Sequence, residues 1–303
     1  MSARRAACAA VRWASRPSGR VPSPVGPLPL ASGAAVPVPS ALARAPAAPR
    51  PYSSAAPSAE QLASELASAA KSRGSANWVF LGPPGVGKGT YASRVATAMG
   101  VPHIAMGDLV RAEIKEGTPV GKEMEAAAAS GALVPDSTVL GLLKERLERG
   151  KADDGEVGFV LDGFPRTAAQ ADALLGFVSV DRVINLGLRE EVLVEKCCGR
   201  RVCGKCGKGW NVADIYVPAG ANGEPEIVMP PLNPPEGCEH LMETRPDDTP
   251  EVVKARLEVY KANAAPVEEF FRARGLMDDF EITSGIKETM PVLLQSLLDI
   301  LKR

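Results

Sequence analysis

The sequence predicts an α/β fold in which a parallel β-sheet is covered by helices on both faces. Short apolar runs bounded by turn residues are typical of buried strands, and they occur at 77–82, 158–164, 181–188 and 277–282. Longer stretches with helical periodicity stand between these runs, as at 137–150 and 250–275. Because helices alternate with buried strands along the chain, the strands are expected to lie parallel in one sheet.

A further short helix is predicted ahead of the first strand, over residues 58–74. Ser58 stands at its N-cap position, and Gln61 stands where a capping box places its second partner. Gly74 predicts the end of the helix, since glycine readily adopts the left-handed conformation that closes many helices.

The first 59 residues differ in composition from the rest of the chain. They contain seven Arg and eleven Pro, but no Lys, Asp or Glu and no periodic apolar face. A segment rich in Arg, Ala and Ser and free of acids is typical of an organellar transit peptide. Its high content of Ala, Ser and Pro favours import into the chloroplast stroma. In contrast, RPYSS at 50–54 resembles the cleavage site of a presequence that directs proteins to the mitochondrial matrix. The remaining alternative is a disordered tail that has no targeting function.

Charge and hydropathy limit the classes of partner. All 36 acidic residues lie after residue 59, together with 28 of the 35 basic residues, which gives that part a net charge of −8. An acidic body argues against broad nucleic-acid binding, so a polyanionic ligand would need a local basic cleft. Neither secretion nor a membrane span is predicted, because no signal-peptide apolar region and no run of 18 apolar residues occurs.

A glycine-rich loop follows the first predicted strand. Residues 82–90 read GPPGVGKGT and fit the phosphate-loop pattern G-x-x-x-x-G-K between a strand and a helix. Glycines let backbone N–H groups surround phosphate oxygens, and Lys88 can reach the β- and γ-phosphates. A glycine-rich turn with a surface lysine is the alternative. Gly89 replaces the usual Ser or Thr, and the hydroxyl follows at Thr90.

Further motifs follow at suitable distances: GDLVR (107–111), GALVPD (131–136), LDGFPRTAAQ (161–170), GRRVCGKC (199–206) and TRPDD (244–248), with Arg256 beyond them. With the GKGT loop, they make residues 77–300 resemble the adenylate kinase family, in its long-lid form and its plant organellar type. The resemblance implies a P-loop kinase fold with a central parallel sheet of about five strands. It implies the reaction ATP + AMP ⇌ 2 ADP, with Mg²⁺ accompanying ATP, in a monomer.

The same resemblance implies a domain organisation. The transit peptide would span 1–59 and the kinase 60–303. The kinase would comprise a core at 76–104, 135–201 and 245–303, an AMP-binding helical segment at 105–134 and a mobile lid at 202–244. The lid segment is rich in Gly and Pro, and MPPLNPPEG at 229–237 predicts no regular structure.

Residue roles carry over at the matching positions. Phosphoryl transfer depends on charge neutralisation and alignment, which Lys and Arg side chains supply. The resemblance implies that Asp162 holds Mg²⁺ through water, with Asp108 assisting. It implies these catalytic residues: Lys88, Asp162, Arg200, Arg245 and Arg256. It implies these ATP contacts: Gly85, Val86, Gly87, Lys88, Gly89, Thr90, Arg200, Gly285, Ile286 and Lys287. It implies these AMP contacts: Met106, Arg111, Ala132, Leu133, Val134, Gly163, Phe164, Pro165, Arg166, Gln170, Arg245 and Arg256.

Two positions depart from the family pattern. Met106 stands where a hydroxyl residue usually precedes the GD pair, so one hydrogen bond toward AMP would be lost, at a net cost of about 0.5–1.5 kcal/mol. Lys196 stands where an arginine commonly stacks on the adenine of ATP. Lysine stacks less well than planar arginine, so the preference for ATP over GTP is expected to be weaker.

The lid holds cysteines with partial zinc-ligand spacing. Some long-lid relatives bind structural zinc there, and Cys203, Cys206, Cys238 and His240 would supply four ligands. Only one residue separates Cys238 from His240, which is one fewer than usual. Reduced thiols packing the lid, or a Cys203–Cys206 redox pair, are the alternatives. Cys197 and Cys198 are interpreted as core thiols, and an odd cysteine number after Cys8 disfavours a complete disulfide framework.

Two other functions remain open at this point. One is a nucleotide-sensing protein with a decayed kinase fold, although every charged group needed for catalysis is present. The other is a kinase with a different triphosphate or monophosphate substrate. The length of the 202–244 segment disfavours uridylate/cytidylate kinases, which usually have a short lid.

Overall fold

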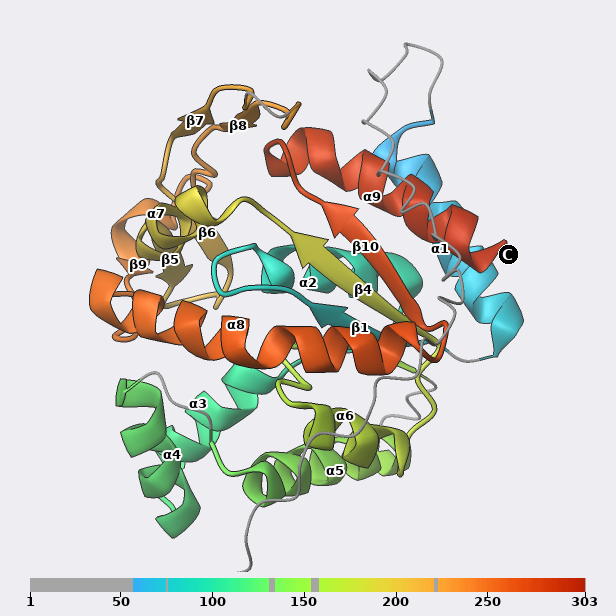
Figure 1. Cartoon of the computed structure of the whole chain (residues 1–303), viewed down its shortest axis with the longest axis vertical. Helices are drawn as coiled ribbons and strands as arrows, with labels where there is room; N and C mark the ends of the chain where they lie inside the picture. Colours follow the sequence, from blue (N-terminus) through green and yellow to red (C-terminus); the bar gives the residue numbers. More distant parts are fainter. Residues whose placement is uncertain (1–56, 75, 131–133, 154–157, 221–222, 303) are drawn as a thin grey trace, which may run out of the picture. The chain divides into compact units, whose positions relative to one another are not determined.

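The computed structural model describes residues 57–74, 76–130, 134–153, 158–220 and 223–302 (Figure 1). The predicted transit peptide therefore lies outside the described part of the chain up to residue 56. In the described residues, no helix is long and apolar enough to cross a membrane.

A five-stranded parallel sheet forms the centre of the described chain, in the order β10-β4-β1-β3-β2. Its strands are β1 (Asn77–Leu81), β2 (His103–Ala105), β3 (Phe159–Asp162), β4 (Arg182–Gly187) and β10 (Met277–Glu281). All four strands predicted from apolar runs are confirmed, as is their parallel arrangement. β2 lies at one edge and has only three residues, which is too short to show a periodic pattern.

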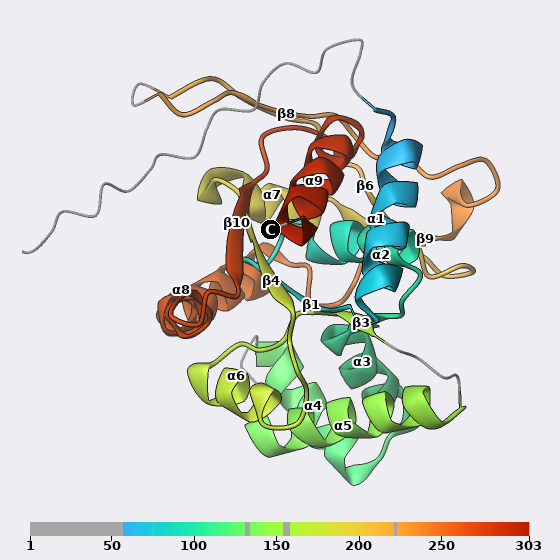
Figure 2. The ribbon, with the colours of Figure 1, turned by 90° about the vertical axis from the view of Figure 1, so that its right-hand side faces the viewer.

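Helices cover both faces of the sheet (Figure 2). One face packs against α1 (Ala59–Arg73), α2 (Lys88–Met99) and α9 (Ile286–Leu301), and the other against α5 (Asp136–Asp153), α6 (Ala168–Leu175) and α8 (Pro250–Arg272). β1 contributes to both layers, since Trp78 and Phe80 join the first cluster and Val79 and Leu81 the second. This two-sided burial explains why the strand is apolar throughout.

Helix α1 begins and ends as the sequence predicts. Ser58 and Gln61 form both bonds of the capping box, and Gly74 closes the helix with a φ of 77°. The buried side chains of α1 pack in the same cluster as α9, and the guanidinium of Arg73 donates to the carbonyl of Leu301 at 2.8 Å. The first helix after the predicted presequence is therefore part of the folded core.

Two helices precede the long α5 on the side of β2. They are α3 (Met106–Glu116) and α4 (Pro119–Ser130), which pack against each other. Gly121 allows this close approach, because a Cβ there would lie 2.3 Å from the carbonyl oxygen of Glu113. In Figure 1, α3 and α4 lie below the sheet, beside α5.

The segment predicted as a lid contains more regular structure than its Gly/Pro content indicates. After η1 (Glu190–Val192) and α7 (Leu193–Cys198), a three-stranded sheet combines β5 (Arg200–Cys203), β6 (Gly209–Asn211) and β9 (Met242–Glu243), and a two-stranded one combines β7 (Ile215–Val217) and β8 (Ile227–Met229). A 3-10 turn, η2 (Glu239–Leu241), precedes β9. The prediction that 229–237 lacks regular structure is wrong at Met229, the last residue of β8, because antiparallel pairing to β7 outweighs the following prolines.

Strand β8 also bonds to the core. Its Val228 amide donates to the carbonyl of Thr283 at 3.3 Å and its carbonyl accepts from the amide of Gly285 at 3.0 Å. Ile215 and Met229 are buried in the same apolar cluster as α9. The β7–β8 hairpin is thereby joined to the loop that precedes α9.

Candidate active site

The phosphate loop joins β1 to α2, and glycines define its shape. Gly82, Gly85 and Gly87 have φ angles of 135°, 89° and 103°, which side chains with a Cβ rarely adopt. A Cβ would lie 2.4 Å from the Leu186 carbonyl oxygen at Gly82, and 2.5 Å from that of Leu193 at Gly85. The loop is thus pressed against β4 and the start of α7, and only glycine fits at those two positions.

Lys88 is the first residue of α2, and its amino group turns back onto the loop. The Nζ atom donates to the carbonyls of Gly82 and Pro83 at 2.8 and 2.9 Å. Burial lowers the pKa of Lys88 to about 8, and the nearby Asp162 carboxylate opposes this shift. A phosphate group would be a stronger partner for this ammonium than two neutral carbonyls.

Asp162 ends β3 beside the first turn of α2. A Cβ on Gly89 would lie 3.2 Å from its Oδ2 atom, so the glycine after Lys88 makes room for this carboxylate. The imidazole Nε2 of His103 is 3.7 Å from the same oxygen. Hard cations such as Mg²⁺ prefer carboxylate and water oxygens, so Asp162 is suited to a magnesium ion near the phosphate loop.

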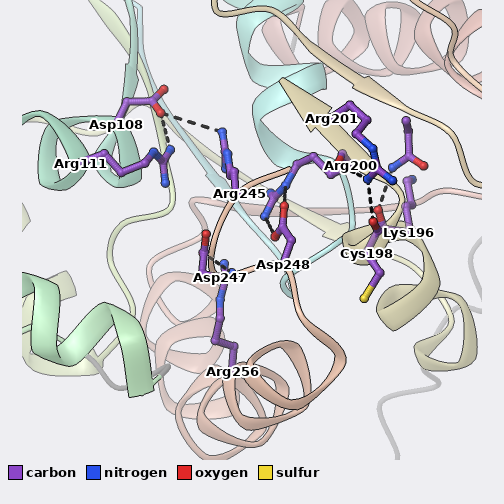
Figure 3. Close-up of polar contacts among 11 residues, drawn as sticks. Asp108, Arg111, Lys196, Cys198, Arg200, Arg201, Arg245, Asp247, Asp248 and Arg256 are labelled. Atoms are coloured by element: carbon purple, nitrogen blue, oxygen red, sulfur yellow. Dashed lines mark hydrogen bonds and ion pairs between the residues drawn. The ribbon is translucent and has the colours of Figure 1, made fainter. Parts of the chain in front are cut away.

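Arginines approach the cleft from α3 and from the segment after β9 (Figure 3). Arg111 forms an ion pair with Asp108 on α3, and Arg245 lies 4.0 Å from the same carboxylate. Burial, together with the neighbouring Arg200 and Arg111, lowers the pKa of Arg245 to about 10. The shared carboxylate partly offsets the repulsion between these cations.

Two further arginines are held by consecutive aspartates (Figure 3). Arg200, at the start of β5, donates to both oxygens of the buried Asp248, with Nε at 2.7 Å. Burial acts to lower the pKa of Arg200. The hydrogen bonds that Arg200 donates to Asp248, together with the charge of that carboxylate, outweigh burial, so the pKa is raised. Arg256 on α8 pairs with Asp247 at 2.7 Å. Asp247 and Asp248, the two aspartates of the TRPDD motif, are therefore the direct partners of two predicted catalytic arginines.

The motif after β3 is organised around a buried amide. Gln170 accepts from the backbone N–H of Arg166 at 2.7 Å and donates to Asp136 at 2.5 Å. The Arg166 side chain donates from Nε to the carbonyl of Gly163 at 2.9 Å. Desolvation and the neighbouring Arg256 lower the pKa of Arg166. Gln170 thus fixes the turn that carries Arg166, in addition to lining the cleft.

One cavity of about 1450 Å³ gathers almost all of these groups. Among the predicted nucleotide contacts, the cleft is lined by Gly85, Gly87, Lys88, Gly89, Thr90, Met106, Arg111, Val134, Asp162, Gly163, Phe164, Pro165, Arg166, Gln170, Arg200, Arg245, Arg256, Gly285, Ile286 and Lys287. Val86 is buried beneath the loop instead. Ala132 and Leu133 lie outside the described residues.

Comparison with known proteins agrees with this geometry. The family model described as adenylate kinase matches residues 80–276. The chain belongs to the adenylate kinase family. It is 53% identical to Adenylate kinase 1, chloroplastic, of Arabidopsis thaliana over 220 residues, which cover 73% of this chain and 77% of the relative. It is 54% identical to Probable adenylate kinase 6, chloroplastic, of Oryza sativa subsp. japonica, again over 220 residues, covering 73% and 76% of the two chains.

A third relative, the Adenylate kinase of Solanum tuberosum, is 53% identical over 73% of this chain and 76% of its own length. The predicted family, its plant organellar type and its phosphotransferase activity are therefore confirmed. The predicted α/β fold with a central parallel sheet is confirmed as well.

The two residues that depart from the adenylate kinase pattern, Met106 and Lys196, both line the cleft. Met106 is 2% exposed and packs in the apolar cluster on the α5 side of the sheet. Lys196 on α7 donates to the carbonyl of Val86 at 3.2 Å and lies 3.6 Å from the sulfur of Met229 on β8. Burial lowers the pKa of Lys196 to about 8. This lysine thus connects the phosphate loop with the β7–β8 hairpin.

The four-ligand zinc set expected from the adenylate kinase resemblance is not assembled in the described residues. The sulfurs of Cys203, Cys206 and Cys238 lie within 4.8 Å of one another. His240 is absent from this cluster and is exposed on η2. A closed structural zinc site needs four ligands, so three thiols alone do not complete one.

Sequence reasoning missed several groups of the adenylate kinase cleft. Asp247 and Asp248 were visible in the TRPDD motif, but their pairing with Arg256 and Arg200 requires the three-dimensional fold. His103 lies beside Asp162 because β2 pairs with β3, and nothing in its local sequence indicates this. Lys208, on the turn between β5 and β6, also lines the cleft.

Proposed function

We propose that this cleft transfers the terminal phosphoryl group of ATP to AMP, with ATP over the phosphate loop and AMP between α3 and the turn that carries Arg166. The observation that carries the proposal is the convergence of Lys88 with arginines from α3, β5, α8 and the DGFPR turn on one cavity. A transferring phosphoryl group spreads charge over its oxygens, and such cations stabilise that charge. In-line transfer between the two nucleotides needs no covalent intermediate with the protein.

The individual roles follow from position. We assign Lys88 to the β- and γ-phosphates, because it begins the helix at the end of the phosphate loop. Arg111 and Arg166 are assigned to the phosphate of AMP, since both lie on the β2–β3 side of the cleft. Arg200, Arg245 and Arg256 are assigned to the phosphates between the two nucleotides. Their carboxylate partners would be exchanged for phosphate oxygens when nucleotides bind.

Magnesium enters the proposal with ATP. Asp162 would hold the ion through water and keep it beside the phosphate oxygens, where its charge assists transfer. Asp108 is a weaker candidate, because Arg111 and Arg245 already share its carboxylate. Structural zinc is not included, because His240 does not join the three lid thiols. Metal analysis of the purified protein tests both statements.

The domain organisation predicted above is retained as part of the proposal. Residues 76–104, 135–201 and 245–303 would form the core, 105–134 would bind AMP, and 202–244 would close over the phosphates. We propose one refinement of this lid: because β8 bonds to Thr283 and Gly285, the β7–β8 hairpin within 202–244 would stay with the core while the β5–β6–β9 part moves. A monomer without nucleic-acid or membrane partners is proposed.

A plastid location is proposed for the mature enzyme. The composition of residues 1–59 favours it, and the relatives from Arabidopsis thaliana and Oryza sativa are named chloroplastic. The stroma is the proposed compartment: RPYSS at 50–54 resembles a mitochondrial cleavage site, but the relatives reported above carry the name chloroplastic. A fusion of residues 1–57 to a fluorescent reporter tests the location by imaging in plant cells. Accumulation outside plastids would contradict it.

The deciding experiment is a coupled assay of ADP formation from ATP, AMP and Mg²⁺. We expect turnover with AMP, and much weaker turnover when UMP, CMP or GMP replaces it. Binding of ATP without any turnover would instead support a nucleotide sensor. Efficient turnover with another monophosphate would support the alternative kinase function.

A further inference from the structure

The three lid thiols form a compact group that the proposed phosphoryl transfer does not use. Cys203 ends β5 and is fully buried, whereas Cys206 is exposed and Cys238 is half-buried. The sulfurs of Cys206 and Cys238 are 4.0 Å apart. No fourth ligand from the described residues joins them, so a closed metal site does not account for their proximity.

Main-chain bonds hold the two thiol-bearing turns against each other. The amide of Gly204 donates to the carbonyl of Leu241 at 2.9 Å, next to the β5–β9 pairing of Cys203 with Met242. On the other side, Cys238 closes its own turn by donating to the carbonyl of Pro235 at 3.1 Å. The thiols are therefore brought together by the fold of the lid itself, and not by a chance contact of long side chains.

We propose that Cys206 and Cys238 form a reversible disulfide that restrains the lid and slows phosphoryl transfer. Their sulfurs need to approach by about 2 Å to reach a disulfide bond length. Cys206 lies on an exposed turn next to Gly207, and Cys238 follows Gly237; both glycines have positive φ angles, of 68° and 86°. Such turns can adjust, whereas buried Cys203 is fixed in its strand.

The chemistry is a thiol–disulfide exchange with a low-molecular-weight disulfide such as glutathione disulfide. The exposed Cys206 thiolate attacks one sulfur of glutathione disulfide, forms a mixed disulfide and releases one glutathione thiolate. The Cys238 thiolate then attacks the Cys206 sulfur and expels the second glutathione thiolate. The protein loses two electrons and two protons, and one glutathione disulfide is reduced to two glutathione molecules.

The disulfide would act on the active site because the same turn borders it. Cys206 and Lys208 both line the nucleotide cavity, and the turn is continuous with β5, which begins at Arg200. Joining the turn to residue 238 fixes the β5–β6 end to the chain that leads into β9 and Arg245. Both cysteines belong to the β5–β6–β9 part, so the disulfide changes the shape of that part where Cys206 and Lys208 line the cavity, and closure of such a segment limits turnover in many enzymes.

The test uses the full chain, oxidised with glutathione disulfide and then reduced with a dithiol. On oxidation we expect the number of titratable thiols to fall from six to four, a non-reduced peptide map to show Cys206 linked to Cys238, and kcat to fall at least twofold. The dithiol should restore both the thiols and kcat. On the same oxidation, Cys206→Ser and Cys238→Ser should lose no thiol pair, and the kcat of each oxidised variant should equal that of its own reduced form.

Cys198→Ser is the matched control, since this half-buried thiol lies on α7 outside the cluster; it should respond as the wild type does. A linkage through Cys203, or no loss of thiols at a large excess of glutathione disulfide, would overturn the proposed pair. One tightly bound metal ion per chain in the purified protein would also overturn it. A Cys206–Cys238 disulfide with unchanged kcat would overturn the control of turnover.

Discussion

The two ends of the phosphate-binding cleft are built in different ways. At the phosphate loop, Lys88 is held by main-chain carbonyls, and the loop shape is fixed by glycines that no other residue can replace. On the opposite side, arginines are held by the side chains of Asp108, Asp247 and Asp248. Under the proposed function, the first arrangement is a preformed cradle, whereas the second is a set of ion pairs that would exchange partners when phosphates bind. Catalysis is expected to be most sensitive at the cradle, and stability at the ion pairs.

The largest effect is expected from Lys88→Ala. Removing the ammonium should lower kcat by roughly 10²–10³-fold, as does the loss of one preorganised charge-stabilising group elsewhere. In the described part of the chain, the ammonium of Lys88 donates to two carbonyls of its own loop, so the thermal midpoint should change little. Steady-state kinetics and thermal unfolding measure both quantities. The control is Lys144→Ala, which removes a lysine of α5 whose ammonium lies over the ring of Phe177. A wild-type kcat in Lys88→Ala would refute the role assigned to Lys88.

On the opposite side, Asp248→Asn should affect stability more than its neighbour does. The side chain of Asp248 is fully buried. Replacing its carboxylate by an amide leaves the charge of Arg200 without a counter-charge, so the free energy of unfolding should fall by about 3 kcal/mol. Asp247→Asn removes a more exposed partner of Arg256 and should cost no more than about 1 kcal/mol. Urea denaturation of the two variants measures the difference. Equal destabilisation would show that burial does not distinguish these ion pairs.

The pH dependence of kcat/KM tests the cradle more finely. Since the pKa of Lys88 is lowered to about 8, its ammonium charge is lost as the pH rises through 8, and kcat/KM should fall there. Lys88→Arg should remove this alkaline limb, because arginine keeps its charge. Lys196 has a similarly lowered pKa, so Lys196→Arg is the control and should retain the limb. If the alkaline fall in kcat/KM disappears in Lys196→Arg and persists in Lys88→Arg, it reports the titration of Lys196 and not of Lys88.

The smallest effect is expected from Lys196→Arg on nucleotide preference. A planar guanidinium stacks on a purine better than an ammonium does, so the ratio of kcat/KM for ATP over GTP should rise about two- to threefold. The KM for AMP should not change, because Lys196 lies at the other end of the cleft, beside Val86 and Met229. An altered KM for AMP would indicate coupling between the two nucleotide sites.

The sequence predicted the elements that local patterns encode. The strands at β1, β3, β4 and β10, the capping box of α1 and the phosphate loop all follow from apolar runs, a Ser–Gln pair and spaced glycines. The identity of the cleft residues came from motif resemblance. The pairing of Arg200 with Asp248 could not be predicted, because it joins positions 48 residues apart that only the fold brings together. His240 as a fourth zinc ligand stays a prediction, since the structure brings only the three thiols within 4.8 Å of one another in the described residues.

The short strand β2 and the strands within residues 202–244 could not be predicted from the sequence either. Three-residue strands carry no periodic signal, and β7–β8 forms because of cross-strand pairing between residues 215–217 and 227–229. The bonds of β8 to Thr283 and Gly285 join segments that are far apart in the chain. Such contacts join the β7–β8 hairpin to the loop before α9, and no local composition indicates them.

Helix α1 also has a consequence for how the precursor is processed. It begins directly after its cap Ser58, and its Leu62, Leu66 and Ala70 are buried while Arg73 holds the carbonyl of Leu301 near the C-terminus. A stromal peptidase that cut within this helix would expose two leucines, each worth about 1.5–3 kcal/mol of burial. If the segment ahead of α1 is removed on import, as proposed above, the folded kinase limits where the mature N-terminus can lie: a cut up to Pro57 leaves the cap of α1 in place, whereas a cut beyond Leu62 removes part of the apolar surface that packs in the same cluster as α9.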